Sequence, residues 1–311
     1  MPSLKAMDLR QLNAVLAVAD HGSFSAAARA LHTVQSNVST HVARLERELG
    51  VELIDRDTGL VTSEGEIVVA RTRRIRGELE ALAADVASAR DQVTGTTHIG
   101  VIGTTARWLV APLVRTMATR HPGVQVVIHD ATTISLLLQL SSGAIDLAVL
   151  TLPVTDPDVE SEHLFDEDRL LLVPVGHPIG AVERITMKDL AGIGLLLEPP
   201  GTRFRNQLDA LAADAGVELT VLAEVDGTRL MASMVFERFG AAILPASAAP
   251  ASLINRWHRI PVEGVPGRSV GLARSRRGLL SAPARALREV MLEVLEDVGP
   301  HQTGVYLAAH D

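Results

Sequence analysis

Residues 23–28 read Ser-Phe-Ser-Ala-Ala-Ala, and residues 34–39 read Val-Gln-Ser-Asn-Val-Ser. Ser23 can cap the free N–H groups at a helix start, and the alanines that follow are strong helix formers. Their small side chains allow a second helix to approach closely. A further helix is expected from about residue 34 to 49, where Val38, Val42 and Leu45 share one narrow apolar stripe. The stretch therefore predicts a helix-turn-helix centred on residues 23–49.

The polar face of the helix at 34–49 carries side chains that suit DNA. Glutamine and asparagine can bond an adenine edge at two atoms, and short hydroxyls reach bases or phosphates. The first turn of a recognition helix reaches the major groove, and an arginine on a following hairpin suits the flanking minor groove. From helical spacing alone, a small helical domain with merely solvated polar side chains is an equal alternative. The expected DNA-contacting residues are Ser25, Gln35, Ser36, Asn37, Ser39, Thr40, Arg44 and Arg56.

Composition predicts a folded, soluble protein of two or three domains, because 311 residues exceed one ordinary compact core. No segment reaches the roughly 18 apolar residues of a membrane span. The net charge of −8 does not favour DNA, yet residues 1–76 carry 10 basic and 9 acidic side chains while the remainder carries 19 and 28. The chain has no cysteine, which excludes thiol nucleophiles, disulfides and cysteine-ligated zinc. With no signal-peptide pattern at its start, a cytoplasmic location is expected.

Two further elements are expected after the helix-turn-helix. Asp57-Thr58-Gly59 is a turn signal that predicts a small hairpin over residues 51–62. Residues 66–92 contain no proline and one glycine, which predicts a long helix. Its apolar positions recur at a 4-3-4-3-4 spacing: Ile75, Leu79, Leu82, Val86, Ala89 and Val93. This coiled-coil-like seam favours pairing of two chains over the alternative, a single helix lying on its own domain.

The remaining sequence alternates apolar strands with helices, a pattern typical of a largely parallel sheet covered on both faces. The predicted strands are 98–103, 124–130, 145–150, 170–175, 193–197, 219–225, 241–244 and 270–273, and the predicted helices are 106–120, 134–140, 203–215 and 229–238. Two such repeats suggest two lobes. The predicted domains are residues 1–65, the linker helix 66–92, and an effector part 93–300, with lobe I at 93–162 and 268–297 and lobe II at 163–267.

A longer stretch of sequence resembles the signature of the LysR-type transcriptional regulators. The resemblance rests on residues 23–28, 31, 34–39, 45–46, 49–53, 56 and 61–66 at fixed spacings. The sequence also departs from the family pattern. Val34 and Ser36 stand where the family usually has serine or threonine and proline, Ile54 where it has phenylalanine, and Thr40 where arginine is frequent. These departures concern the DNA sequence that is read more than the ability to bind DNA.

The resemblance implies a multidomain fold: an all-α winged helix-turn-helix, a long linker helix and a two-lobed α/β effector domain similar to periplasmic solute-binding proteins. It also implies a ligand site between the lobes. The candidate residues lie at the carboxyl ends of predicted strands, where open α/β sheets bind ligands, and hydroxyls beside free helix N–H groups suit an anion. They are Thr104, Thr105, Thr151, Thr202, Arg203 and Asp226. Arg203 can pair with a carboxylate, whereas each threonine alone is also explained by helix capping.

The leading hypothesis is a transcriptional regulator modulated by a small, anionic metabolite. Its expected partners are double-stranded DNA with an interrupted inverted repeat, a second or further copies of the chain in a homodimer or homotetramer, and RNA polymerase as a candidate. Neither a cofactor nor a metal is expected. A solute-binding module without a DNA role is the alternative. An α/β enzyme is the third hypothesis, but Gly95, Gly100 and Gly103 fit no nucleotide-binding fingerprint and no Gly-x-Ser-x-Gly elbow occurs.

Overall fold

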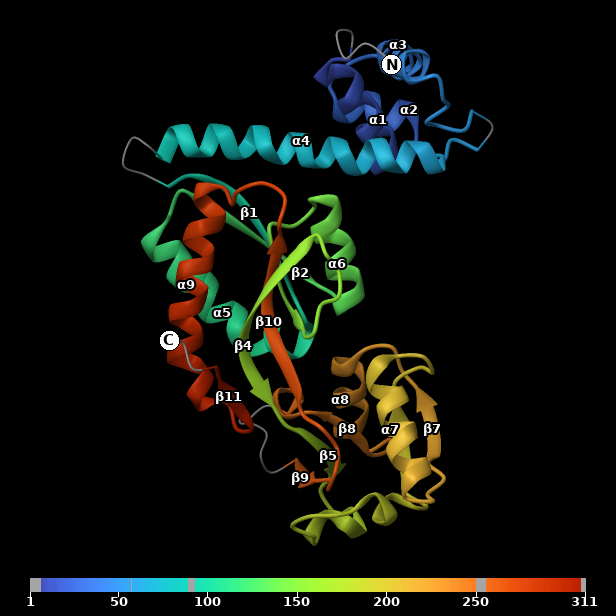
Figure 1. Cartoon of the computed structure of the whole chain (residues 1–311), viewed down its shortest axis with the longest axis vertical. Helices are drawn as coiled ribbons and strands as arrows, with labels where there is room; N and C mark the ends of the chain where they lie inside the picture. Colours follow the sequence, from blue (N-terminus) through green and yellow to red (C-terminus); the bar gives the residue numbers. More distant parts are fainter. Residues whose placement is uncertain (1–6, 57, 89–92, 250–255, 309–311) are drawn as a thin grey trace.

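The computed structural model describes residues 7–56, 58–88, 93–249 and 256–308, arranged in three parts along its longest axis (Figure 1). The N-terminal part is helical and consists of α1 (Leu9–His21), α2 (Phe24–Ala30) and α3 (Gln35–Leu49) around one apolar core. Ser23 caps α2, because its Oγ accepts a hydrogen bond from the N–H of Ala26 at 3.2 Å. Val38, Val42 and Leu45 are buried, so the predicted stripe of α3 is confirmed.

The hairpin after α3 is reduced to a short wing. Ile54 and Val61 form an antiparallel bridge, and the N–H of Asp55 donates to the carbonyl oxygen of Leu60 at 2.9 Å. Both Leu53 and Ile54 are fully buried in the helical core. The wing is therefore anchored at its base by apolar packing.

Helix α4 (Ser63–Ser88) connects the helical part to the rest of the chain (Figure 1). Val69 lies in the helical core and Ala84 is buried near the other end. The predicted seam residues Ile75, Leu79, Leu82 and Val86 are all exposed. The predicted seam residue Ala89 and the predicted end of the helix at 89–92 lie outside the described residues. Val93, also predicted in the seam, instead packs against the core of lobe I. An exposed apolar row on a helix is unfavourable in water, so the seam is available to cover another surface.

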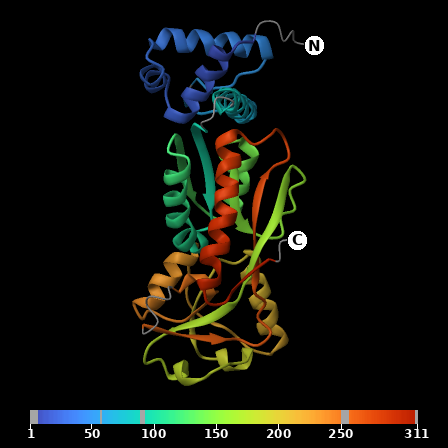
Figure 2. The same ribbon diagram turned by 90° about the vertical axis from the view of Figure 1, so that its left-hand side faces the viewer.

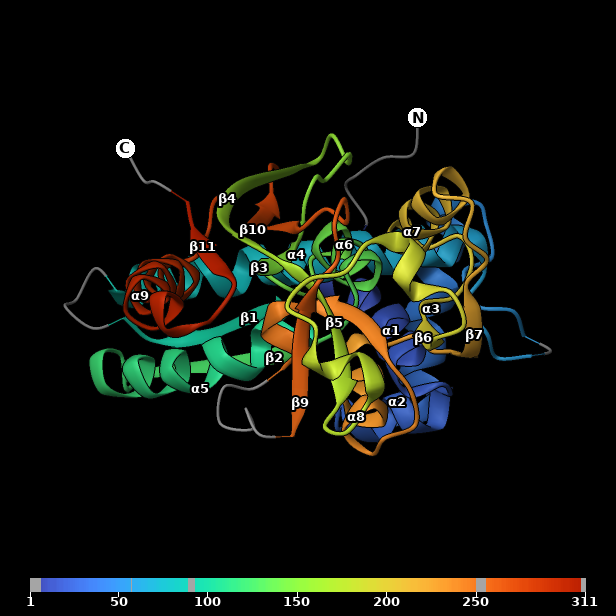
Figure 3. The ribbon, with the colours of Figure 1, turned by 90° about the horizontal axis from the view of Figure 1, so that it is seen from below.

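Lobe I is built on a six-stranded sheet with the order β11-β4-β10-β3-β1-β2. Helices α5 and α9 lie on one side of this sheet and α6 on the other (Figures 1 and 3), and α9 faces the viewer in Figure 2. Its elements are β1 (Gly95–Val101), α5 (Gly103–Arg120), β2 (Val124–Asp130), α6 (Thr133–Ser142), β3 (Leu147–Thr151), β4 (Val159–Glu167), β10 (Arg268–Ser275), α9 (Ala282–Val298), η5 (Gly299–His301) and β11 (Val305–Leu307).

Lobe II contains the strand orders β8-β5-β9 and β6-β7, and a parallel bridge between Leu195 and Ala241 joins β6 to the start of β8. Its core gathers apolar side chains from β5, β6, β8 and α7. Its elements are β5 (Arg169–Pro174), η1 (Pro178–Ala181), η2 (Met187–Leu190), β6 (Gly194–Leu197), α7 (Arg203–Asp214), β7 (Thr220–Glu224), α8 (Thr228–Phe236), β8 (Ala242–Pro245), η3 (Ala246–Ala248) and β9 (Trp257–Pro261).

Two expectations about the sheets are wrong. The sheets are mixed rather than largely parallel, because β10 runs antiparallel to both β3 and β4, and β5 runs antiparallel to both β8 and β9. The expected lobe boundary at 162/163 falls inside β4, which pairs with β10 along its whole length. Strand β4 escapes sequence-based prediction because charged side chains interrupt it, as in Glu160 and Glu162, and β9 and β11 are short. Lobe I thus extends to Glu167 and includes β11.

Within the described residues, none of the helices combines the length and apolar character that crossing a membrane requires.

Candidate DNA interface and effector site

Helix α3 presents its polar side chains to solvent. Ser25, Gln35, Ser36, Asn37, Thr40 and Arg44 are exposed, and Ser39 is half-buried. Gly50, with a φ of +73°, ends the helix in the left-handed region that glycine adopts without strain. The residues expected to contact DNA thus lie on or beside one accessible helix, and their individual contacts with DNA stay predictions.

One hydrogen bond joins the two helices of the helix-turn-helix at this surface. The hydroxyl of Ser25 on α2 donates to Oε1 of Gln35 on α3 at 2.8 Å. The Gln35 side chain is therefore held in one orientation, with its amide N–H groups left to donate and one lone pair of Oε1 left to accept. Bidentate recognition of adenine needs both capacities. Ser25 is thus placed to orient Gln35, a link that the sequence does not indicate.

Two of the other candidates are engaged within their own turn. Nδ2 of Asn37 donates to Oγ1 of Thr33 at 3.0 Å, and the hydroxyl of Thr40 donates to the carbonyl oxygen of Ser36 at 2.7 Å. These local bonds would have to open or be shared for a base contact. Gln35, which is oriented from another helix, is therefore the strongest candidate for direct reading of bases.

Glu46 connects the recognition helix to the wing, a role that sequence reasoning missed. Its Oε1 accepts hydrogen bonds from the N–H groups of Leu53 at 3.0 Å and Ile54 at 3.3 Å, and its Oε2 pairs with Arg56 at 2.7 Å. The guanidinium of Arg56 also lies 5.7 Å from the ring centre of Phe24. Arg56, expected to enter the minor groove, is half-exposed but held by these partners. The carboxylate fixes the base of the wing relative to α3.

Two arginines of α4, Arg73 and Arg74, attach this helix to its neighbours. Arg73 pairs with Asp20 of α1 at 2.5 Å, and Nη2 of Arg74 donates to the carbonyl oxygen of Ser141 at the end of α6. Asp20 belongs to the helical part and Ser141 to lobe I. Helix α4 is thus bound to both sides.

The two chain crossings between the lobes meet at a buried ion pair. Glu167 ends β4 and is only 1 % exposed, and its Oε1 lies 2.5 Å from Nη2 of Arg268 at the start of β10. Arg268 also donates to Oγ1 of Thr104 at 2.5 Å, and Oε2 of Glu167 accepts from the N–H of Ser247 at 3.0 Å. Arg107 of α5 completes the set with hydrogen bonds to the carbonyl oxygens of Ser247 and Ala248. Thr104, Arg107, Glu167, Ser247 and Arg268 are called the inter-lobe cluster below.

Positive charge near this cluster is not fully neutralised. Arg107 and Arg259 donate to backbone carbonyl oxygens between residues 247 and 249. Burial lowers the pKa of both guanidinium groups, and for Arg107 the nearby charge of Arg259 adds to the effect. Carbonyl oxygens accept hydrogen bonds but carry no full negative charge. An anion placed here would therefore be favoured.

Arg169, at the start of β5, extends this positive region into lobe II. Its Nη1 donates to the carbonyl oxygens of Pro266 at 3.2 Å and Gly267 at 2.8 Å, and its guanidinium lies 4.0 Å from the ring centre of Phe204. Burial lowers the pKa of Arg169 to about 10, and the charge of Arg268 contributes in the same direction. The group stays protonated at neutral pH, in surroundings that compensate its charge incompletely.

Two buried hydroxyl groups, one on a residue of the inter-lobe cluster and one on the chain neighbour of Thr104, have no hydrogen-bond partner among the described residues. They are Oγ1 of Thr105 and Oγ of Ser247, and both residues are at least 95 % buried. An unsatisfied buried hydroxyl costs free energy. Such groups are expected where a ligand, or water that a ligand displaces, supplies the missing partner.

The structure places the predicted effector residues in three different settings. Thr104 belongs to the inter-lobe cluster and Thr105 lies beside it. Thr151 ends β3, pairs with Val270 two residues from Arg268, and its N–H donates to Thr133 at 3.2 Å. Asp226 is exposed in the turn before α8.

Sequence reasoning missed the other polar residues near this site, because no local pattern distinguishes them. They are Arg107, Arg169, Ser247, Arg259 and Arg268.

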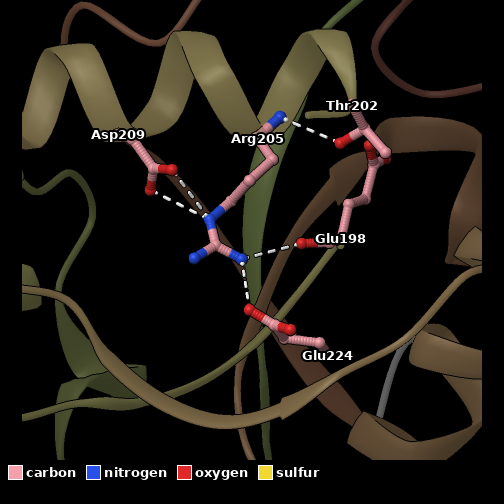
Figure 4. A network of polar contacts seen from close by, with 5 residues as sticks. All are labelled: Glu198, Thr202, Arg205, Asp209 and Glu224. Carbon is pink, nitrogen blue, oxygen red and sulfur yellow. Dashed lines mark hydrogen bonds and ion pairs between the residues drawn. The ribbon is translucent and has the colours of Figure 1, made fainter. Parts of the chain in front are cut away.

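Thr202 and Arg203 form the third setting, at the start of α7. Oγ1 of Thr202 accepts from the N–H of Arg205 at 3.4 Å, which is helix capping (Figure 4). Arg205, rather than Arg203, carries the dense ion network there, pairing with Asp209 and Glu224 (Figure 4). Arg203 is exposed, and its positive charge contributes to lowering the pKa of Arg169.

Comparisons with known proteins match this architecture. Residues 9–66 match the family model described as a bacterial regulatory helix-turn-helix protein of the lysR family, and residues 90–296 match the LysR substrate binding domain. A probable hydrogen peroxide-inducible genes activator of Streptomyces viridosporus is 32 % identical over 298 residues, which cover 93 % of this chain and 95 % of the relative. The DNA-binding transcriptional dual regulator OxyR of Escherichia coli is 31 % identical over 246 residues, covering 78 % and 81 %.

Solved structures agree in fold. A full-length OxyR variant from Pseudomonas aeruginosa is 24 % identical, with a TM-score of 0.73 over 98 % of this chain and 99 % of that one. CbnR, a LysR family transcriptional regulator, is 24 % identical, with a TM-score of 0.68 over 93 % and 99 %.

A helix-turn-helix joined by one helix to a two-lobed α/β domain defines a ligand-responsive transcriptional regulator. This chain belongs to the LysR family of bacterial helix-turn-helix regulators, and it combines the DNA-binding and effector-binding domains of that family. The predicted family and fold class are thereby confirmed. The alternative of a solute-binding module without a DNA role is not supported.

We expect Gln35→Ala to relax the preference for the specific DNA site by about 1–3 kcal/mol, the discrimination of one bidentate base contact. Ser25→Ala should act in the same direction but more weakly, because Gln35 keeps its groups and loses only its orientation. Ser39→Ala should weaken binding to all sequences alike, as expected for a phosphate contact. Fluorescence anisotropy with specific and scrambled duplexes measures each ratio. An equal loss on both duplexes in Gln35→Ala contradicts the assigned role.

Proposed function

We propose that this regulator is controlled by a small anionic metabolite that binds between its lobes, beside the inter-lobe cluster. The observation that carries the proposal is the combination of incompletely neutralised arginines with the unpartnered hydroxyls of Thr105 and Ser247. A carboxylate would supply acceptors to the arginines and to a hydroxyl at once. Thr104 and Thr151 from lobe I, with Thr202, Arg203 and Asp226 from lobe II, are proposed to frame this ligand.

The two-lobed arrangement explains how such a ligand would act. A molecule that contacts both lobes binds one relative orientation of them better than another, and so shifts the population toward that orientation. Arg107 and Arg169 connect the site to both lobes through backbone carbonyl oxygens. Ligand contacts there would bear directly on how the lobes meet.

Several relatives, among them those from Streptomyces viridosporus and Mycobacterium leprae, are named as probable hydrogen peroxide-inducible genes activators. In proteins, reversible peroxide sensing usually proceeds through a cysteine thiolate. The present sequence contains no cysteine, so it has no thiol to oxidise. We infer that this regulator responds to a bound molecule rather than to thiol oxidation.

We further propose that the protein acts as a homodimer, or as a homotetramer built from such dimers, through the exposed apolar row of α4. Ile75, Leu79, Leu82 and Val86 face solvent at a spacing that suits a second helix. Two helix-turn-helix units presented in this way would read an interrupted inverted repeat. No catalytic role is proposed, a cytoplasmic location follows from this function, and RNA polymerase remains a candidate partner.

Removal of the unpartnered hydroxyl tests the effector site. Thr105→Val should raise the free energy of unfolding by about 1 kcal/mol, because a buried hydroxyl without a partner is replaced by a methyl group. The same change should remove the response to any effector that bonds this hydroxyl. Urea unfolding measures the first effect, and the DNA affinity in a panel of two- to six-carbon carboxylates, with their amides as matched controls, measures the second. A clear loss of stability would show that the hydroxyl has a structural partner.

Disruption of the seam tests the oligomer. Leu79→Asp should convert the dimer to a monomer and reduce affinity for an inverted repeat strongly, while affinity for one half-site stays similar. Val182→Asp, at an exposed apolar position in lobe II, is the matched control. Analytical ultracentrifugation and DNA titration over a salt series measure both, and affinity should fall steeply with salt because phosphate contacts dominate. An unchanged dimer in Leu79→Asp contradicts the proposal.

A further inference from the structure

A second cavity lies in lobe I, separate from the inter-lobe cluster. It has a volume of about 760 Å³ and opens between β4, β10, the start of α9 and the loop that precedes α9. Figure 2 shows these elements side by side near the end of lobe I that faces α4. None of the residues that line it belongs to the inter-lobe cluster. A molecule bound here would therefore be additional to the proposed effector.

Apolar side chains form one part of the lining. Leu272 contributes from β10, and Leu279 and Leu280 contribute from the loop before α9. Leu279 is 86 % exposed, the highest value among the large apolar residues that the structure describes as exposed. An apolar side chain held over a cavity gains stability when a ligand covers it. This part of the cavity suits an apolar ligand body.

Charged side chains form the other part, with an excess of positive charge. Four arginines and three glutamates line the cavity. Arg288 is held by Glu162 through two hydrogen bonds of 3.1 and 2.6 Å, and Arg274 pairs with Glu160. Arg285 differs from these, because its acidic partner lies outside the lining. The charge that balances the lining thus comes from outside it, and a monoanionic ligand in the cavity would supply the same charge from within.

The partner of Arg285 is Asp85 on α4. Oδ1 of Asp85 lies 3.1 Å from Nη2 of Arg285 and also accepts from the N–H of Ala282, the first residue of α9, at 2.9 Å. This carboxylate attaches the far end of α4 to lobe I. An anion in the cavity that bonds Arg285 would compete with Asp85 for the same guanidinium. The cavity is therefore coupled to the helix that carries the DNA-binding domain.

We propose that this cavity binds a monoanionic small molecule with an apolar body. Its charged group pairs with Arg285 in place of Asp85, and the contact between α4 and α9 is weakened as a result. The ligand's affinity for the state with a free Arg285 exceeds its affinity for the paired state. Binding thus shifts the protein toward the state in which α4 is less firmly held. The ligand would thus alter DNA binding through α4, which carries the helix-turn-helix, without movement of the lobes relative to each other.

The probe for the test is 4-phenylbutyrate, with 4-phenylbutyramide as the uncharged control, titrated into the full-length protein by calorimetry. We expect the carboxylate to bind and the amide not to bind. Arg285→Gln should lower the affinity about tenfold or more, the effect of one charge-assisted hydrogen bond. Arg120→Gln, which breaks a surface pair with Glu293 in the same lobe, is the matched control and should bind as the wild type does.

Two further variants test the competing carboxylate and the apolar lining one at a time. Asp85→Asn should increase the affinity for 4-phenylbutyrate severalfold, because the competing charge is gone while a side-chain oxygen remains for the N–H of Ala282. Leu279→Ala should reduce affinity without changing the melting temperature, since its side chain is exposed. Bound probe should also speed hydrogen exchange at the start of α9.

Three results would overturn the proposal: no binding by the wild type, an unchanged affinity in Asp85→Asn, or loss of binding in Thr105→Val instead of Arg285→Gln. The last result would place the probe between the lobes. It would support the inter-lobe effector site while rejecting the second cavity.

Discussion

The geometry of the effector domain depends on the buried ion pair between Glu167 and Arg268. The chain passes between the lobes twice, and these two residues stand at the two crossings. A buried carboxylate without its partner would be costly, so both crossings are held together. Thr104 accepts a hydrogen bond from Arg268, and the N–H of Ser247 donates one to Glu167. The lobes therefore meet at a fixed polar point, and the groups that would contact a ligand are arranged around it.

The helical part shows a related use of one carboxylate. Glu46 is only partly exposed and accepts two backbone N–H groups at the base of the wing while pairing with Arg56. The DNA-binding surface and the inter-lobe cluster are thus both held rigidly, and each leaves a few polar groups free to bind a partner. Preorganised groups bind a partner with less loss of conformational entropy. This is the physical basis on which one chain can hold a DNA surface and a ligand site at the same time.

The sequence predicted those features that depend on local periodicity. The helical spacing of Val38, Val42 and Leu45 identified the buried face of α3, and the spacing on α4 identified a row that is indeed exposed. The capping role of Ser23 followed from residue type alone. The mixed sheet was not predictable in this way, because charged side chains recur along β4 and make it resemble a loop. Strand direction is set by the return of β10 from lobe II, which local patterns do not encode.

The candidate effector site was predictable only at one end. Thr104 and Thr105 were selected as candidates because they follow a recognisable strand and begin a helix. Arg169 and Arg259 lie on the neighbouring strands β5 and β9 of lobe II, and Arg107 of lobe I comes near Arg259 only when the lobes pack. These arginines matter through their charge, because they are buried and bonded to backbone carbonyl oxygens, which leave that charge partly uncompensated.

Helix α4 is a stiff lever as well as a connection. Its 26 residues span about 39 Å at 1.5 Å per residue. A tilt of about 10° at the end held by Asp85 would therefore displace the opposite end by about 7 Å, roughly two base-pair steps along DNA. Small changes in lobe I are enlarged in this way by the length of one helix. In the proposed dimer, such a displacement would change the distance between the two helix-turn-helix units, and with it the spacing of half-sites that the protein can bind.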